Sequence, residues 1–399
     1  MNVSIRSRII VLVVVTMTVV LASTRLNADT GTCGGTSLTL PFTDVPSSNV
    51  FFCSIAEAFF SGLANGTTST TYNPGGTVPR EQMAAFVSRT MDQSVKRASK
   101  RAALDQFWTT QGQNNLALTV VGSGPVLVKS DGADLWVANV FDSTVARVRA
   151  SDGRLLGTWS GASGAIGVLI AMGKVFITGQ SVPGALYEID PTLPAGAVTT
   201  VSSSLGNGPQ GIAFDGERIW TANQVFPGSV SIVTLSPLTV TNITTGFSAP
   251  YGVIYDGGNI WVTDLNDASL KKLDSSGNII LTVLVGNSPR HPAFDGTNIW
   301  VPDNHSNTVT VVRATGTLSG TVLATLTGNG LSSPFQVAFD GERIMVTDAT
   351  SDSVSLWKAS DLTPIGTFST GVNTVPFGVC GDGLNFWITF HNSNKLARF

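Results

Sequence analysis

Asp256-Gly257-Gly258-Asn259-Ile260-Trp261-Val262 is one of seven related stretches that decide the fold of this chain. Asp-Gly is a strong signal for a β-hairpin turn, and the apolar residues after it are typical of a strand. Residues at the position of Trp261 recur at intervals of 39 to 45 residues, which is the period of a β-propeller. They are Trp136, Phe176, Trp220, Trp261, Trp300, Met345 and Trp387.

Each repeat divides into four strand-like pieces. An apolar run such as Gly211–Phe214 precedes the Asp-Gly turn and the Trp-containing strand follows it, while pieces such as Val354–Trp357 and Ile365–Thr370 come third and fourth. One such sheet cannot bury both of its faces, but sheets stacked around an axis can. Residues 116–399 therefore predict a seven-bladed β-propeller with about 41 residues in each blade.

The two ends of this region predict how the ring closes. The chain stops at Lys395–Phe399, which aligns with a third strand, so the seventh blade lacks its fourth. Leu116–Gly122 resembles the fourth strands at Leu281–Gly286 and Leu323–Gly328. We expect 116–122 to pair with the last blade and thereby to cover sheet edges that favour aggregation when they are free.

The runs Trp136-Val137-Ala138-Asn139 and Trp261-Val262-Thr263-Asp264 resemble the NHL and YVTN propeller repeats and those of the streptogramin lyase group. The resemblance covers about 280 residues and implies the propeller fold, which hosts many unrelated functions. In the lyase group, catalysis uses a His with acidic residues and magnesium.

Composition excludes several classes of protein. Lys and Arg total 23 against 26 Asp and Glu, so the net charge is −3, and no nucleic-acid partner is expected. Charged residues make up 12% of the chain, and there are 42 glycines, which disfavours a long all-helical protein. A hydrophobic content of 42% is enough for a packed core.

Residues 1–28 have the pattern of a secretory signal peptide. Arg6 and Arg8 precede the apolar run Ile9–Leu21, and small residues follow it, with cleavage expected after Ala22 or Ala28. A helix of 13 residues rises only about 20 Å, too little to span a bilayer. We expect a secreted protein of the cell surface or envelope, without a transmembrane span after signal removal. In that compartment Cys33 and Cys53 are candidates for a disulfide, and Cys380 is expected in the core.

Residues 29–90 predict a small α-helical module. Phe51–Leu63 shows helical spacing, and Pro79-Arg80-Glu81 suits the start of a second helix. A helical linker is expected over 91–115; its basic cluster, Lys96-Arg97 with Lys100-Arg101, is typical of a solvated helix face.

The module resembles one S-layer homology (SLH) repeat. The resemblance rests on Phe42-x-Asp44-Val45, Gly62-Leu63-x-x-Gly66, Tyr72-x-Pro74 and Arg80 before Met83-Ala84-Ala85-Phe86. It implies attachment to a cell-wall polymer such as peptidoglycan, with Asp44 and Arg80 at the polar positions that face it. This chain has one copy where the family carries three, and Gln82 replaces the usual Glu. The alternative is a docking module without a sugar site.

Polar residues follow the Trp strand in most repeats, three positions after the marker. Two interpretations stay open. In the first, these residues bind a ligand, and the three Asp carboxylates among them hold calcium or magnesium. In the second, they cap tight turns. Repetition at one blade position favours turn capping. No other cofactor is expected. The residues are Asn139, Asn223, Asp264, Asp303 and Asp348.

The segments that enter each blade share a face with those loops and carry Tyr251, His291 and Phe335. Aromatic and polar side chains around a central channel predict a ligand site there. We therefore expect an exported cell-surface protein whose propeller binds a protein or carbohydrate. The alternative is a metal-dependent envelope lyase or lactone hydrolase that uses His291, although Arg290 and Pro292 rather than an acid flank that residue.

Overall fold

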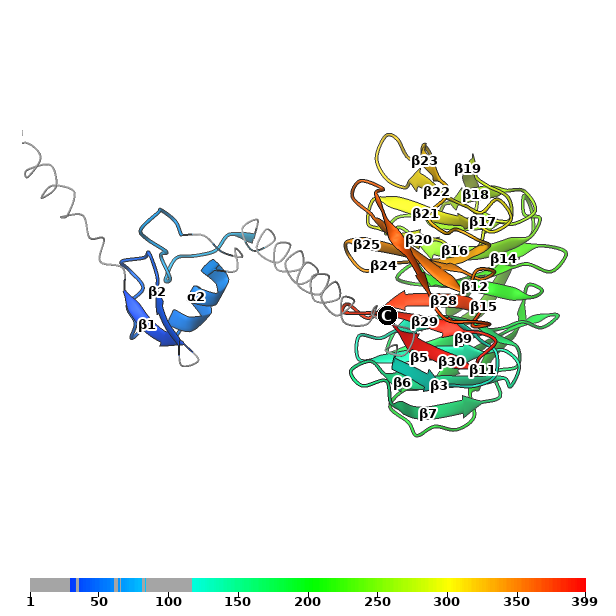
Figure 1. The fold of residues 1–399 in the computed structure, drawn as a ribbon, viewed down its shortest axis with the longest axis horizontal. Coiled ribbons are helices and arrows are strands. Elements are labelled where there is room, and N and C mark those ends of the chain that lie inside the picture. Colours follow the sequence, from blue (N-terminus) through cyan, green and yellow to red (C-terminus); the bar gives the residue numbers. More distant parts are fainter. Residues whose placement is uncertain (1–28, 34–35, 61–63, 65, 81–82, 84–116) are drawn as a thin grey trace, which may run out of the picture. The chain divides into compact units, whose positions relative to one another are not determined.

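The computed structural model describes residues 29–33, 36–60, 64, 66–80, 83 and 117–399. The chain divides into two compact units, Met1–Arg97 and Ala98–Phe399, and each is described by itself (Figure 1). The expected signal peptide, 1–28, and linker, 91–115, lie outside the described residues. Within the described part of the chain, no helix is long and apolar enough to cross a membrane.

The first unit combines a hairpin with a helix. Strands β1 (Thr30–Cys33) and β2 (Thr36–Thr39) pair antiparallel, and α2 spans Phe52–Phe60. A disulfide joins Cys33 in β1 to Cys53 in α2. The hairpin corrects the expectation of a purely helical module, because its Thr-rich strands carry too few apolar residues to show a strand period. Of the expected second helix, only Arg80 and Met83 are described, and the N–H of Met83 bonds the carbonyl of Pro79 at 3.0 Å.

A small apolar core holds this unit together. It joins residues before the helix to one face of α2, and Cys33, Leu38, Phe59 and Tyr72 pack around it. Its buried members are Leu40, Phe42, Val45, Phe52, Ile55 and Ala56.

The second unit is a seven-bladed β-propeller built from seven four-stranded antiparallel sheets, as predicted. In each blade the first strand lies innermost and the others follow outward in chain order, except in the last blade. The first four blades are β4 (Pro125–Ser130), β5 (Asp134–Asn139), β6 (Thr144–Arg149), β7 (Leu155–Ser160); β8 (Ala165–Ala171), β9 (Lys174–Gly179), β10 (Gly184–Ile189), β11 (Thr199–Leu205); β12 (Pro209–Phe214), β13 (Ile219–Asn223), β14 (Ser229–Leu235), β15 (Leu238–Ile243); and β16 (Pro250–Tyr255), β17 (Ile260–Asp264), β18 (Ser269–Leu273), β19 (Ile279–Leu284).

The remaining blades have the same order and lead to the chain terminus. They are β20 (Ala293–Phe294), β21 (Asn298–Asp303), β22 (Thr308–Arg313), β23 (Val322–Leu326); β24 (Pro334–Phe339), β25 (Arg343–Asp348), β26 (Ser353–Lys358), β27 (Pro364–Ser369); and β28 (Pro376–Gly381), β29 (Phe386–Phe390), β30 (Lys395–Arg398).

The ring closes as the sequence predicted. Strand β3 (Ala117–Val120) pairs antiparallel with β30 and supplies the fourth strand of the last blade, with Leu118 opposite Ala397. Figure 1 shows β3, in cyan, beside β30, in red. The N–H of Val121 continues the ladder with a 3.0 Å bond to the carbonyl of Asn394. The first and last parts of the propeller are therefore hydrogen-bonded to each other.

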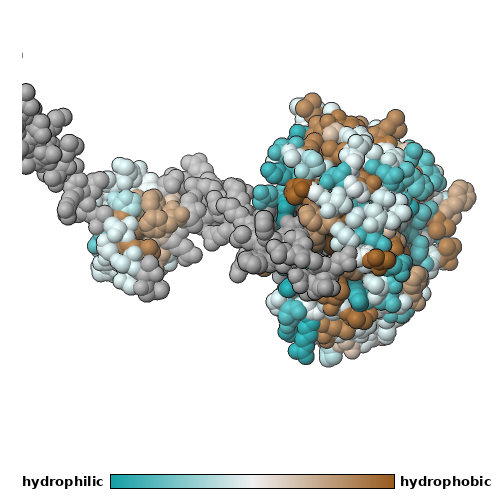
Figure 2. All heavy atoms as spheres, viewed as in Figure 1, coloured by the Kyte–Doolittle hydropathy of each residue, from teal (hydrophilic) through white to brown (hydrophobic). Residues whose placement is uncertain are grey.

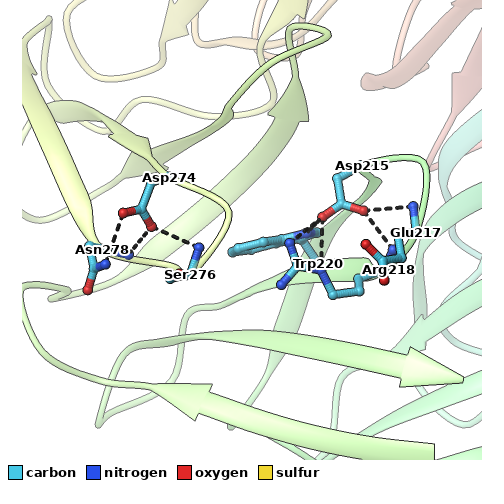
Figure 3. Close-up of polar contacts among 7 residues, drawn as sticks. All are labelled: Asp215, Glu217, Arg218, Trp220, Asp274, Ser276 and Asn278. Atoms are coloured by element: carbon cyan, nitrogen blue, oxygen red, sulfur yellow. Dashed lines mark hydrogen bonds and ion pairs between the residues drawn. The ribbon is translucent and has the colours of Figure 1, made fainter. Parts of the chain in front are cut away.

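The repeated Asp-Gly-x-x-Ile-Trp stretch has a physical explanation in the third blade (Figure 3). One carboxylate oxygen of Asp215 accepts the backbone N–H groups of Glu217 and Arg218, and the other accepts the indole Nε1–H of Trp220 at 2.7 Å. Gly216 has φ +98°, a left-handed conformation that favours glycine. In the sixth blade Met345 replaces Trp, and Arg343 bonds the second oxygen of Asp340 at 2.8 Å instead.

Candidate functional site

The strand order gives the propeller two distinct faces. We call the face at which the inner strands begin the loop face; the second strand of each blade also ends there, for example at Asn139 opposite Pro125. The other face carries the Asp-Gly turns, and we call it the hairpin face. The candidate binding residues from the sequence lie near the loop face, at the ends of strands.

Asp264 is fully buried and holds its own blade together. Its carboxylate accepts the backbone N–H groups of Ser248 and Ala249 at 2.9 and 2.8 Å, and the ammonium of Lys271 at 2.7 Å. The bonded amides belong to the loop that leads into the same blade. The side chain therefore links the end of the second strand to the start of the first.

Asp303 and Asp348 occupy the same position in the next two blades and are also fully buried. Asp303 accepts bonds from the hydroxyls of Thr308 and Thr310 at 2.9 and 2.6 Å, and Asp348 accepts one from Ser355. Burial raises the pKa of Asp303 to about 6 and that of Asp348 to about 7. Among the described residues, no Lys or Arg forms an ion pair with either carboxylate to offset its desolvation.

The amide residues at this position behave in the same way. Asn139 donates to the hydroxyl of Thr144 at 3.1 Å, and Asn223 donates to Ser229 and Ser231. Both side chains are fully buried. The geometry of all five residues favours the turn-capping interpretation, in which a polar group satisfies nearby backbone and hydroxyl groups.

The structure does not bring the three carboxylates together as the calcium or magnesium interpretation requires. Each of Asp264, Asp303 and Asp348 is bonded within its own blade. Among the residues described, no three His, Cys, Asp or Glu side chains are grouped so that they could hold a metal ion. The carboxylates and histidines of the described residues therefore do not fit the magnesium that the resemblance to the lyase group implied.

Seven side chains converge at the loop-face end of the central channel, each from the second residue of an inner-strand segment. This set, which we call the plug, combines aliphatic, aromatic and polar groups, and most of its members are at most 7% exposed. An apolar cluster joins several of them across the ring. Its members are Val126, Ile166, Gln210, Tyr251, Arg290, Phe335 and Phe377.

The structure brings together the three predicted residues Tyr251, His291 and Phe335. Ring centroids lie 4.8 Å apart for Tyr251 and His291, and 5.6 Å apart for His291 and Phe335. The guanidinium of Arg290 lies 4.4 Å from the ring centroid of Tyr251, a cation–π arrangement. Phe377 stacks on Phe335 at 4.3 Å and extends the aromatic set. These contacts close the channel at the loop face.

None of the three histidines, all of which lie in the described propeller, hydrogen-bonds a carboxylate of the described residues. His291 is 4% exposed with its Nε2 unbonded, and burial, with Arg290 and Lys129 nearby, lowers its pKa to about 3. His305 bonds the hydroxyl of Ser288, and His391 bonds the carbonyl of Pro125. General-base catalysis by a His–acid pair has no matching geometry here.

The loop face also carries a group of exposed apolar side chains that the sequence analysis did not predict, and we call this group the apolar rim. Large apolar side chains stand exposed on the loops after the second strands of the first three blades: Phe141 is 70% exposed, Val182 67% and Phe226 87%, with Val225 beside it at 40%. The signal was apolar residues next to turn-forming prolines, in Val182-Pro183 and Phe226-Pro227. Figure 2 shows apolar patches among polar ones on the visible propeller surface.

The two candidate wall-binding residues differ in role within the first unit. The carboxylate of Asp44 accepts the backbone N–H groups of Tyr72 and Asn73 at 2.8 and 2.6 Å, and these bonds lower its pKa against the opposing effect of desolvation. Asp44 therefore ties the Phe42–Val45 motif to the Tyr72–Pro74 motif. Arg80 is exposed at the start of its helical turn.

Comparison with known proteins adds information on the fold. No protein-family model and no curated protein sequence matches the chain. Virginiamycin B lyase from Staphylococcus aureus is similar in structure, with TM-score 0.60 and 15% identity over 71% of this chain and 98% of that one. A streptogramin B lyase (TM-score 0.58, 15% identity, 72% and 98%) and the WD40 propeller domain of Doa1 (0.58, 13%, 71% and 95%) are also similar. These likenesses show the seven-bladed propeller fold.

Proposed function

We propose that this chain is an exported cell-surface binding protein whose propeller binds a protein ligand through the loop face. The observation that carries the proposal is the apolar rim of Phe141, Val182, Val225 and Phe226. Exposed apolar side chains gathered on one face of a soluble domain are typical of protein interaction sites. The plug beneath the rim supports the same face with rigid aromatic packing.

A protein ligand fits this rim better than a carbohydrate does. Two of the four rim residues are valines, which have no ring on which a sugar can stack. Phe226 extends from the loop with 87% of its surface exposed, as an anchor side chain does before it enters a partner's pocket. A carbohydrate ligand remains an outcome that the test below distinguishes.

The lyase or lactone-hydrolase alternative finds less support in the same geometry. His291 is neutral at physiological pH because of its lowered pKa, and it lies below the surface among aromatic rings. The nearby carboxylates are engaged elsewhere: Asp264 by the Lys271 ammonium and Asp303 by the Thr310 hydroxyl. The structural likeness to lyases is a likeness of fold, and function belongs to the site.

Export and wall attachment complete the proposal. The pattern of residues 1–28 supports export, and the disulfide between Cys33 and Cys53 suits an oxidising compartment. Arg80 supports attachment of the first unit to an anionic wall polymer, because an exposed guanidinium can bond such groups bidentately. Asp44 contributes by holding its loop rather than by binding the polymer.

Photo-crosslinking on living cells tests the proposed binding face. A benzophenone amino acid replaces Phe226 on the loop face or, as a matched control, Leu318, which is 59% exposed on the hairpin face. We expect a discrete protein adduct from position 226 and none from position 318. Adducts of equal yield from both positions, or no adduct from either, would contradict the proposal; an adduct that is lost after glycosidase treatment would show a glycan ligand.

A further inference from the structure

The central channel is a well that is closed at one end. At the loop face the plug residues Val126, Ile166 and Tyr251 are 4 to 6% exposed. Further along the inner strands some side chains are more accessible: Ile254 and Phe339 are half-buried and Lys129 is exposed. The channel therefore opens toward the hairpin face and ends at the plug.

Lys129 is the one charged residue in its layer of the well. It is the fifth residue of an inner-strand segment, and the other six blades carry apolar residues at that position. Those residues are Leu169, Ala213, Ile254, Ala293, Ala338 and Cys380. For packing alone, a leucine would suit this aliphatic position better than an ammonium group does.

The Lys129 ammonium forms no ion pair or hydrogen bond with any described residue, unlike the ammonium groups of Lys271 and Lys174, which bond Asp264 and Asp190. It lines two adjoining cavities of about 260 Å³ each, and no Asp or Glu lines either of them. Desolvation by the channel wall lowers the pKa of Lys129, although part of its side chain stays accessible.

Two further polar side chains, His291 and Gln336, line the first of these two cavities together with Lys129. His291 is 4% exposed, and its Nε2 is buried without a hydrogen-bond partner. Gln336 uses its Oε1 to accept the N–H of Val379 at 2.8 Å. An unbonded buried ring nitrogen in a native structure calls for a partner, and the cavity beside it offers room for one. The remaining wall is aliphatic, including Leu127, Val168, Ile212 and Val253.

We propose that this well is a binding site for a small carboxylate with an apolar body. The carboxylate pairs with the Lys129 ammonium and hydrogen-bonds the neutral His291 ring, while the apolar body contacts the aliphatic wall. The lining of the two cavities has one cation, Lys129, and no Asp or Glu, which suits a ligand with a single negative charge. The aliphatic wall disfavours a polyanion such as a sugar phosphate. The site lies on the opposite side of the plug from the rim, so it stands independently of the function proposed above.

Calorimetric titration of the full chain tests the site with hexanoate as the probe and hexan-1-ol as its neutral match. We expect saturable binding of hexanoate at one site and binding of the alcohol at least about tenfold weaker, because the charge-assisted bond is missing. Lys129→Met is expected to weaken hexanoate binding by about tenfold or more, and Lys129→Arg to keep it within about threefold.

A stability measurement separates loss of the site from loss of the fold. Lys129→Met should melt close to the temperature of the unliganded parent, because the Lys129 side chain is exposed in the channel and methionine has a similar length. Equal hexanoate affinity in the parent and in a folded Lys129→Met protein would overturn the proposal. So would the absence of saturable hexanoate binding to the parent.

Discussion

The indole nitrogen of Trp220 lies 2.7 Å from the second carboxylate oxygen of Asp215, five residues earlier in the chain. Equivalent bonds of 2.6 to 2.9 Å join Asp131 to Trp136, Asp256 to Trp261, Asp295 to Trp300 and Asp382 to Trp387. Each bond connects the turn on the hairpin face to a fully buried ring between blades. The repeated motif therefore stabilises the fold. Asp and Trp recur together because the carboxylate accepts the indole N–H, and both groups keep a hydrogen-bond partner when they are buried.

Removing this bond should destabilise the propeller. Trp220→Phe keeps most of the ring but leaves one oxygen of a half-buried carboxylate with fewer donors, and we expect a loss of about 1–3 kcal/mol in the free energy of unfolding. Chemical denaturation measures it. Glu217→Ala is the control in the same turn; it changes an exposed side chain and is expected to stay within about 0.5 kcal/mol of the parent. An unchanged midpoint for Trp220→Phe would contradict the assigned role.

Closure of the ring by β3 gives a prediction with a matched control. Val121 donates its N–H to Asn394, so Val121→Pro removes a bond between the two ends of the propeller. In an antiparallel edge strand the neighbouring N–H points away from the partner, so Val120→Pro leaves the ladder intact. We expect Val121→Pro to lower the melting temperature by several degrees more than Val120→Pro does. Val121→Ala measures the part of that loss that comes from packing, and similar melting of both proline variants would count against closure by this strand.

The raised pKa of Asp348 predicts a specific pH dependence of stability. Burial raises its folded pKa from the usual 3.8 of an aspartate to about 7, so the folded state favours the neutral acid. The stabilisation is full below about pH 4 and is lost as the pH rises through about 7. Asp348→Asn keeps the side chain neutral, and Asn stands at this position in the first and third blades. The variant should gain on the order of 2 kcal/mol relative to the parent between pH 5 and pH 7.

Asp352 supplies a control of opposite sign. It accepts the N–H groups of Asn373 and Val375, and its pKa is lowered despite some desolvation. Asp352→Asn should therefore destabilise at neutral pH, and the difference from the parent should shrink as the pH falls below about 4. Thermal melting across this range measures both variants. A difference between Asp348→Asn and its parent that does not change with pH would refute the buried-acid account.

Wall attachment predicts different results for Arg80 and Asp44. Arg80 is exposed, so Arg80→Ala should reduce retention on isolated cell walls several-fold without altering the melting of the first unit. Asp44→Ala should lower stability, because two backbone N–H groups lose their acceptor. Equal retention of the parent and the Arg80→Ala protein would remove Arg80 from the binding role.

Much of the fold was predictable because local signals agreed with the global arrangement. The Asp-Gly turns and the regular spacing of the Trp residues predicted the seven blades. The likeness of 116–122 to a fourth strand predicted how the ring closes, and the pairing of Leu118 with Ala397 confirms it. The hairpin of β1 and β2 was not predicted. Its first strand, Thr30–Cys33, alternates exposed and half-buried side chains but has no alternating apolar residues that would indicate a strand.

The candidate site was harder to predict for a different reason. A turn-capping Asp and a ligand-binding Asp are the same residue type at the same spacing, so only burial separates them, and Asp264, Asp303 and Asp348 are fully buried. The approach of Tyr251, His291 and Phe335 was predicted as a shared face. The close packing of these three rings depends on the radius of the propeller ring, which no local sequence pattern encodes.

The central claim, that the loop face binds a protein, is tested most directly with the partner captured by crosslinking at position 226. The double variant Phe141→Ser and Phe226→Ser removes two exposed rings that bury little in the free propeller, and Leu318→Ser is the control on the hairpin face. Measured by calorimetry, the double variant should bind the purified partner about 10- to 100-fold more weakly than the parent, with an unchanged melting temperature, and Leu318→Ser should bind normally. Equal affinity of the double variant and the parent would contradict the account.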